Sequence, residues 1–136
     1  MQAKAIARFV RMAPRKTRLL VALVRGRSVD EARRQLAFSP KDAAEPVLKV
    51  LNSAVANATN NLKMNAATLM VSEARVDEGP AFHRYMPRAQ GRATPIRHRT
   101  SHIHITVEDA VERKAEAEKI KTAAVKKAAA KKAKKA

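Results

Sequence analysis

Histidines provide the first pattern with a possible chemistry. His98, His102 and His104 share one face of an expected strand, where imidazole nitrogens could bind zinc. However, the chain contains no cysteine, that face carries no carboxylate before Glu108, and the flanking arginines repel a cation. We therefore expect imidazoles that face phosphate or water, and we predict neither a metal site nor a cofactor.

Nucleophiles and acids provide no second pattern. The five serines and the scattered acids form no recognisable triad, carboxylate pair or nucleophile elbow. Neither a P-loop nor a GxGxxG sequence is present. The sequence leaves open catalytic pairs between residues that are distant in the chain, but the skewed charge and composition favour binding over catalysis. We predict that the protein is not an enzyme.

Arginine is the residue type whose placement indicates a chemistry. Seven basic residues without an acid among them crowd the expected first strand and first helix: Arg8, Arg11, Arg15, Lys16, Arg18, Arg25 and Arg27. Five more lie in an expected hairpin: Arg84, Arg88, Arg92, Arg97 and Arg99. A solvated face normally mixes both signs, whereas the guanidinium fork suits bidentate phosphate contact. We predict that both sets bind folded RNA by its shape and backbone.

The overall charge agrees with a polyanionic partner. The 136 residues include 29 Lys+Arg and 12 Asp+Glu, giving a net charge of +17. The excess is distributed, at +7 over residues 1–78, +3 over 79–109 and +7 over 110–136. No acid occurs between Gly79 and Val107, so this polar stretch needs an external partner to hold its shape. With no Trp, a platform of several stacking aromatics is excluded; Phe82 and Tyr85 either stack on a base or brace the hairpin.

Two other readings of the basic composition are less favoured. No acid precedes Asp30, as in a mitochondrial transit peptide, but helix signals from Pro14 leave little to cleave. An anionic-membrane binder would need a strongly apolar amphipathic face beside the lysine run. The longest apolar run, residues 19–24, is also far shorter than the roughly 20 residues of a membrane helix.

The helices that position these residues can be read from caps and spacing. After a blurred strand over residues 3–12, Pro14 begins a helix that ends at Gly26. A capping box from Ser28 to Glu31 opens a second helix. A third begins at Ser39-Pro40 and ends in the Asn57–Asn61 cluster, with a kink or a later start at Pro46. The expected buried residues are, in turn, Leu19, Leu20, Leu23 and Val24; Val29, Ala32 and Leu36; and Ala44, Val47, Leu48, Leu51, Ala54, Val55 and Ala58.

Alternation predicts two strands after the helices. Residues 69–77 form one, and residues 97–108 form another, with Ile103, Ile105 and Val107 on one face. Turn residues around 87–91 join them into a long hairpin, which could reach about 33 Å at about 3.3 Å per residue. Because an isolated two-stranded ribbon is marginal in water, we expect RNA or protein around it.

Two sets of short motifs carry a family resemblance over residues 3–108. The first set is PRK at 14–16, LL at 19–20, RG at 25–26, AAEP at 43–46, LNSA at 51–54, NA at 57–58 and NN at 60–61. The second is VDEGP at 76–80, PRAQGRA at 87–93 and RTSHI at 99–103. In this order and spacing, the chain resembles the bacterial branch of the large-subunit ribosomal protein twenty-two family.

The resemblance implies an α+β body on the outside of the large subunit, bound to its rRNA, with partners that include neighbouring ribosomal proteins. It also implies a role in early subunit assembly and a location in the cytoplasmic ribosome. The hairpin would line the peptide exit tunnel and meet the nascent polypeptide, and changes at its tip are associated in the family with macrolide resistance. By match, residues 82–84 would adjoin the tip, and the tip itself would be Met86, Pro87, Arg88, Ala89, Gln90, Gly91, Arg92 and Ala93.

Two features depart from the family pattern. Ala13 stands where a capping Ser is frequent, which removes a cap worth about 1 kcal/mol. The Ala/Lys-rich segment after Asp109 has no counterpart in the family core. Its composition suggests a disordered or helical tail and, as an alternative function, a histone-like DNA-compacting protein. Truncation at Asp109 would separate these functions, because only the DNA-compacting protein should lose its binding with the tail.

Together these observations predict an α+β fold of three helices packed on a small antiparallel sheet, with a long protruding β-hairpin. Residues 1–109 would form one rRNA-binding domain, including a hairpin arm at about 79–104, and residues 110–136 a basic tail. The predicted function is structural: the body binds rRNA, and the arm passes between RNA segments and shapes the tunnel wall.

Overall fold

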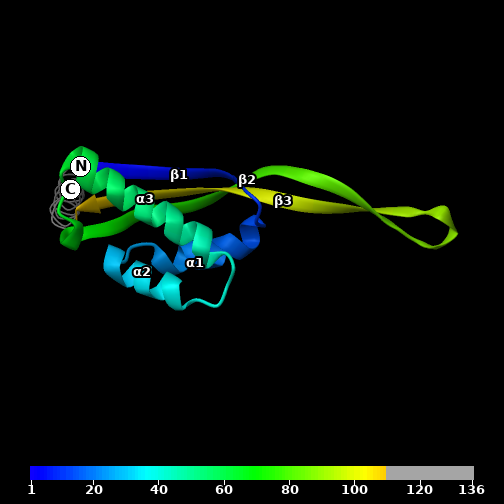
Figure 1. The fold of residues 1–136 in the computed structure, drawn as a ribbon, viewed down its shortest axis with the longest axis horizontal. Coiled ribbons are helices and arrows are strands. Elements are labelled where there is room, and N and C mark those ends of the chain that lie inside the picture. Colours follow the sequence, from blue (N-terminus) through cyan, green and yellow to red (C-terminus); the bar gives the residue numbers. More distant parts are fainter. Residues whose placement is uncertain (110–136) are drawn as a thin grey trace, which may run out of the picture.

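The computed structural model describes residues 1–109 and has the predicted α+β architecture, with three helices on one antiparallel sheet and a long hairpin (Figure 1). The predicted tail at 110–136 lies outside the described residues. In chain order the elements are β1 (Gln2–Val10), α1 (Pro14–Val24), α2 (Val29–Phe38), α3 (Ala44–Leu62), β2 (Leu69–Pro87) and β3 (Ala93–Asp109). Short 3₁₀ turns at Ala66–Thr68 and Ala89–Gly91 precede β2 and β3.

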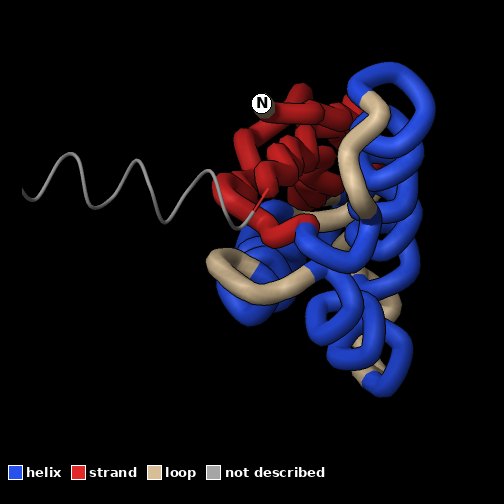
Figure 2. The backbone as a smooth tube through the Cα atoms, turned by 90° about the vertical axis from the view of Figure 1, so that its left-hand side faces the viewer, coloured by secondary structure: helices blue, strands red, loops and turns tan. Residues whose placement is uncertain are grey.

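The sheet has the order β1-β3-β2, so β3 lies in the centre. Its register aligns small and branched apolar residues in three rows across the strands. These rows are Ala3–Val107–Val71, Ala5–Ile105–Ala74 and Ala7–Ile103–Val76. All but the half-buried Ala7 are buried. The helices cover this face of the sheet, as the view along the strands shows (Figure 2), and the predicted alternation in the last strand is confirmed.

The sheet narrows from three strands to two at Ser101. There β1 makes its last pair, between Val10 and Ser101, while Ser101 also pairs with Glu78 of β2. Beyond this point β2 and β3 continue alone as far as the pair Pro87–Ala93. We call this two-stranded part, residues 79–100, the arm; it extends away from the body, and its tip lies opposite the N-terminus (Figure 1).

The arm begins at a register shift and ends in a tight turn. The shift falls between Glu78 and Ala81, beside Gly79. At the tip, the Arg88 amide donates to the Arg92 carbonyl over 2.8 Å, and Gln90 has a left-handed backbone with φ of 59°. The predicted turn around residues 87–91 is therefore confirmed.

The predicted buried face of helix α1 is confirmed for Leu20 and Val24 but not for Leu19 and Leu23. Leu20, Val21 and Val24 are buried against β2, together with Pro14 and Thr17, whereas Leu19 and Leu23 are 57% and 50% exposed. The prediction was wrong for Leu19 and Leu23 because the run of apolar residues contains two stripes with i, i+4 spacing, and the prediction included both. Only packing decides which stripe faces the sheet.

Helix α2 begins and packs as predicted. The Ser28 hydroxyl accepts a hydrogen bond from the Glu31 amide at 3.4 Å, and Val29, Ala32 and Leu36 are buried. The Glu31 carboxylate, however, pairs with Arg27, so it does not return to the Ser28 amide as in a full capping box.

Helix α3 starts later than Ser39-Pro40, which confirms the later start considered for Pro46. Pro46 lies in the first turn, where a missing N–H costs little. Val50 joins the buried stripe and Leu48 is only half-buried, while the helix continues through the asparagine cluster to end at left-handed Lys63. Within residues 1–109, no helix combines the length and apolarity needed to cross a membrane.

Candidate nucleic-acid interface

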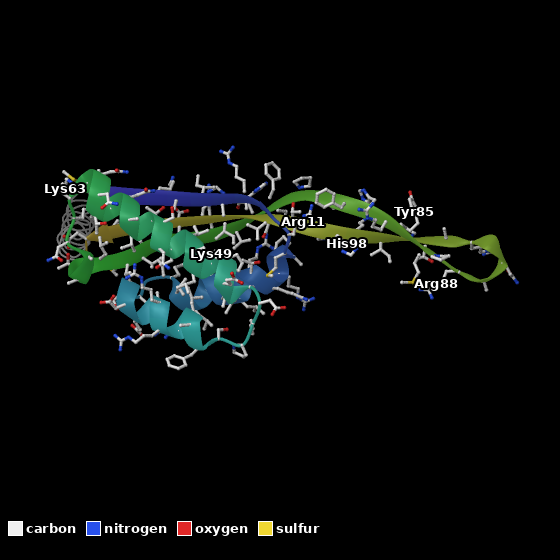
Figure 3. All side chains as sticks on the ribbon, viewed as in Figure 1. Arg11, Lys49, Lys63, Tyr85, Arg88 and His98 are labelled. Atoms are coloured by element: carbon white, nitrogen blue, oxygen red, sulfur yellow. The ribbon has the colours of Figure 1, made fainter. Side chains whose placement is uncertain are left out.

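The arm presents its arginines to solvent with little internal compensation. Arg84, Arg88, Arg92, Arg97 and Arg99 are all exposed. Arg99 pairs with Glu78 at the base of the arm, at 3.2 Å. The other four have no carboxylate partner within residues 1–109. Figure 3 shows Arg88 near the tip, and Tyr85 lies on the same ribbon with 73% of its surface exposed.

Three of the N-terminal basic residues make contacts within the fold. The outer edge of β2 would otherwise expose unpaired carbonyls, and α1 covers them. Arg25 Nε donates to the Ala74 carbonyl at 3.0 Å, and Arg18 Nε donates to the Val76 carbonyl at 3.3 Å. Arg27 instead donates to the Leu23 carbonyl at 2.8 Å and pairs with Glu31. Arg18 and Arg25 therefore also protect a sheet edge from pairing with other strands.

The remaining N-terminal basic residues are free of such contacts. Arg8, Arg11, Arg15 and Lys16 are exposed, and none pairs with a carboxylate in the described part of the chain. Arg11 extends from the end of β1 to the arm, where its guanidinium carbon lies 5.7 Å from the ring centre of Phe82 (Figure 3). This contact is a cation–π interaction, and it braces Phe82 against the body.

Two cavities flank the segment between β1 and α1. The first, of about 450 Å³, lies at the base of the arm and is lined by Arg11, Ala13, Phe82, Arg84, Arg97, His98, Arg99 and Thr100. The second, of about 460 Å³, also contains Arg11 and Ala13 but extends toward Lys16, Lys41 and Asp42. Sequence reasoning missed Lys41, which stands alone in a loop and gave no signal. It also did not bring Arg11 together with the arm.

The histidines do not gather into a metal site. His102 Nδ1 accepts a hydrogen bond from the Phe9 amide at 3.0 Å, and His104 Nε2 lies 3.3 Å from Asp77. Residues 1–109 contain no group of three or more candidate metal ligands. The expectation that these imidazoles face phosphate or water is therefore wrong for His102 and His104, because neighbouring strands supply partners. Burial lowers the pKa of His104, the positive charge of Arg75 lowers it further, and Asp77 opposes both.

A body stabilised by its own apolar rows and carrying an exposed arginine arm has the organisation of a structural binding protein. Comparison with known proteins identifies the family. Residues 5–108 match the family model described as ribosomal protein L22p/L17e. The chain therefore belongs to this family, as the motifs suggested; it is a structural ribosomal protein rather than an enzyme.

Individual relatives agree with this assignment. The chain is 58% identical over 106 residues to the large ribosomal subunit protein uL22 of Desulfitobacterium hafniense; the alignment covers 78% of this chain and 93% of the relative. It is 52% identical over 109 residues to the protein of the same name from Clostridium novyi, covering 80% and 98%. The expected location in the cytoplasmic ribosome is confirmed.

Proposed function

We propose that this protein is built into the large ribosomal subunit, binds its rRNA, supports subunit assembly and contributes its arm to the wall of the polypeptide exit tunnel. The observation that carries the proposal is the arm itself. Seven strand pairs, from Ala81–Arg99 to Pro87–Ala93, extend beyond the three-stranded sheet, and together with the turn that joins them they carry five arginines and no carboxylate. A ribbon of this kind needs a surrounding polyanion to balance its charge.

The proposed rRNA ligands are the exposed basic residues of the arm and of the β1–α1 region. Arg8, Arg11, Arg15 and Lys16 are favoured among the N-terminal set because no carboxylate in residues 1–109 competes for them. Arg18, Arg25 and Arg27 already donate to backbone carbonyls, so they would bind RNA with the N–H groups left over. On the arm, the proposed ligands are Arg84, Arg88, Arg92, Arg97 and Arg99.

The tip residues, 86–93, would form the part of the arm that meets the nascent polypeptide. Small residues at 89, 91 and 93 keep the turn narrow, and Met86 presents an exposed apolar side chain. Neighbouring large-subunit proteins are further proposed partners. Nothing in this role requires a chemical step.

Salt dependence tests the RNA-binding part of this proposal. The full chain is titrated with large-subunit rRNA fragments between low and moderate ionic strength. Because binding to phosphates releases counterions, log Kd should change linearly with log salt, by about 0.7 to 0.9 per phosphate contact. An affinity that is indifferent to salt would contradict rRNA binding through these residues.

Site-specific crosslinking tests the tunnel part separately. A photoreactive amino acid replaces Gln90 at the tip or, as the control, Ala56 on the exposed side of α3. In ribosomes carrying a stalled nascent chain, only the tip position should crosslink to that chain. Equal labelling from both positions, or none from the tip, would contradict the tunnel role while leaving rRNA binding intact.

A further inference from the structure

The cavity at the base of the arm has an unusual charge balance. Four of its lining residues are arginines, drawn from the body and from both strands of the arm, and none is acidic. Arg99 has Glu78 as a partner. Arg11, Arg84 and Arg97 have no carboxylate partner within residues 1–109. Arg11 lies over Phe82, and Arg84 is on the same face of the ribbon as Phe82 because successive side chains alternate. Arg97, which pairs with His83, is on the opposite face.

No acidic residue of the described part of the chain, residues 1–109, lines this cavity. Glu78 is the carboxylate at the start of the arm, and it is shared between Arg99 at 3.2 Å and Arg18 of α1 at 3.9 Å. The second cavity differs, because Asp42 lines it beside Lys16 and Lys41. Of these two cavities, the first combines several arginines with no acidic lining residue from 1–109. Gathering like charges costs free energy, which an anion would recover.

Size and shape also suit an anion attached to a larger molecule. A volume of about 450 Å³ equals roughly fifteen water molecules at about 30 Å³ each, enough for a phosphate and part of its sugar. The guanidinium groups supply donors in planar forks. Ala13, the residue before α1, provides no side-chain cap, so no side-chain oxygen of its own occupies the start of this helix.

We propose that an RNA backbone phosphate occupies this cavity and bridges Arg11 of the body to Arg84 of the arm. This inference rests on the proposed rRNA-binding function and assigns it a particular site. Because Arg11 precedes α1 while Arg84 lies on the ribbon, one phosphate would hold the arm at a fixed angle to the body. The bridge falls just beyond Ser101, where β1 stops supporting the sheet.

A nucleic-acid backbone fits better than an acidic side chain of a neighbouring protein. The second cavity lies on the other side of the same segment and shares Arg11 and Ala13 with the first. Lys16 and Lys41 line it, so positive groups continue past the start of α1. An RNA backbone has a phosphate at every nucleotide and can contact both cavities, whereas a single carboxylate could contact only one of them.

Charge-matched variants test the site. Arg11→Gln/Arg84→Gln removes two charges from the cavity, and the control Arg34→Gln/Lys49→Gln removes two exposed charges from α2 and α3. Circular dichroism confirms that each variant is folded. In titrations with large-subunit rRNA at several salt concentrations, the cavity variant should lose at least tenfold in affinity, with a salt slope lower by about 0.7 to 0.9. The control should lose less than threefold.

The outcomes separate this inference from the proposed function. If both double variants bind like the wild type, with the same salt dependence, the cavity is not a phosphate site but rRNA binding stands. Equal losses in the two variants would show only a general charge effect and would likewise overturn the site. If the wild type itself shows no salt-dependent binding, the proposed function fails first.

A distance measurement tests the bridge. The natural chain has no cysteine, so spin labels can be attached uniquely through Ala56→Cys on α3 and Ala89→Cys at the tip. Adding pyrophosphate, as a minimal probe, should narrow the label-to-label distance distribution in the otherwise natural chain but not with Arg11→Gln/Arg84→Gln. Poly-glutamate serves as the comparison. No narrowing with pyrophosphate, or narrowing with poly-glutamate alone, would overturn the phosphate bridge.

Discussion

Replacing Gly79 by alanine should weaken the junction between body and arm. Gly79 lies at the register shift where the arm begins, and its backbone does not need a left-handed φ. Its constraint is space. An added Cβ would lie 2.4 Å from Thr100 Oγ1 and 3.1 Å from His102 Nε2. Thr100 is only 2% exposed and its hydroxyl donates to the Pro80 carbonyl at 2.7 Å, so it cannot move without losing that bond.

The magnitude follows from three contributions. Overpacking of a well-packed site costs about 1 to 3 kcal/mol, and the lost hydrogen bond adds about 1 kcal/mol. Alanine restricts the unfolded chain more than glycine does, which returns about 0.5 to 1 kcal/mol. The free energy of unfolding should therefore fall by about 1 to 3 kcal/mol.

Urea denaturation followed by circular dichroism measures this change, and Gly91→Ala is the matched control. Gly91 lies on the same arm with nothing within 4 Å of an added Cβ. Its φ of +65° makes alanine strained without a steric clash, so this control shows what backbone strain alone costs. Thr100→Ala removes the clashing oxygen, so combining it with Gly79→Ala should cost less than the sum of the single changes. An unchanged urea midpoint for Gly79→Ala, or simple additivity in the double variant, would refute the reasoning.

Four further predictions concern the body. Leu20→Ala should cost about 2 to 5 kcal/mol in urea denaturation because Leu20 is buried against the sheet, whereas Leu19→Ala should cost less than about 1 kcal/mol. Ala13→Ser should raise stability by about 1 kcal/mol, measured as an increased melting temperature, because Ala13 has the extended backbone of a capping residue without a capping side chain. Arg25→Gln should cost about 1 kcal/mol in the same assay and increase aggregation, measured by light scattering, since it uncovers the Ala74 carbonyl on an edge strand. The lowered pKa of His104 means that folding disfavours its charged form, so the unfolding free energy should decline as pH falls below about 6.5, and His104→Gln should flatten that decline in urea titrations at several pH values.

Sequence periodicity predicted the sheet and the hairpin because their signals are local. Ile103, Ile105 and Val107 alternate strictly, and the turn residues near Gly91 mark where the chain reverses. The buried face of α1 could not be predicted from such local signals. Leu19 and Leu20 begin equivalent stripes, and the choice between them depends on contacts with β2, about 50 residues further along the chain.

The candidate site could be predicted as a composition but not as a geometry. The arginines of both sets were identifiable because no acid accompanies them. Which arginines stabilise the fold and which stay available for binding was not predictable, since Arg18 and Arg25 reach carbonyls of β2 only after the fold has formed. The meeting of Arg11 with Phe82, beside Arg84, joins positions more than 70 residues apart, and no local pattern encodes it.

Strands β2 and β3 each divide into a part that stabilises the fold and a part that is available for binding. The body part of β2 ends at Glu78 and that of β3 begins at Ser101; both parts are covered by the helices and supply two of the three positions in every buried row. In the arm, every side chain from Phe82 to Pro95 is exposed, so the arm buries almost no apolar surface on its own. Substitutions in the outer arm should therefore change affinity with little effect on stability, and substitutions in the rows should do the reverse. Gly79 and Thr100 lie at the boundary, where the fold sets the direction of the arm and a single methyl group affects both properties.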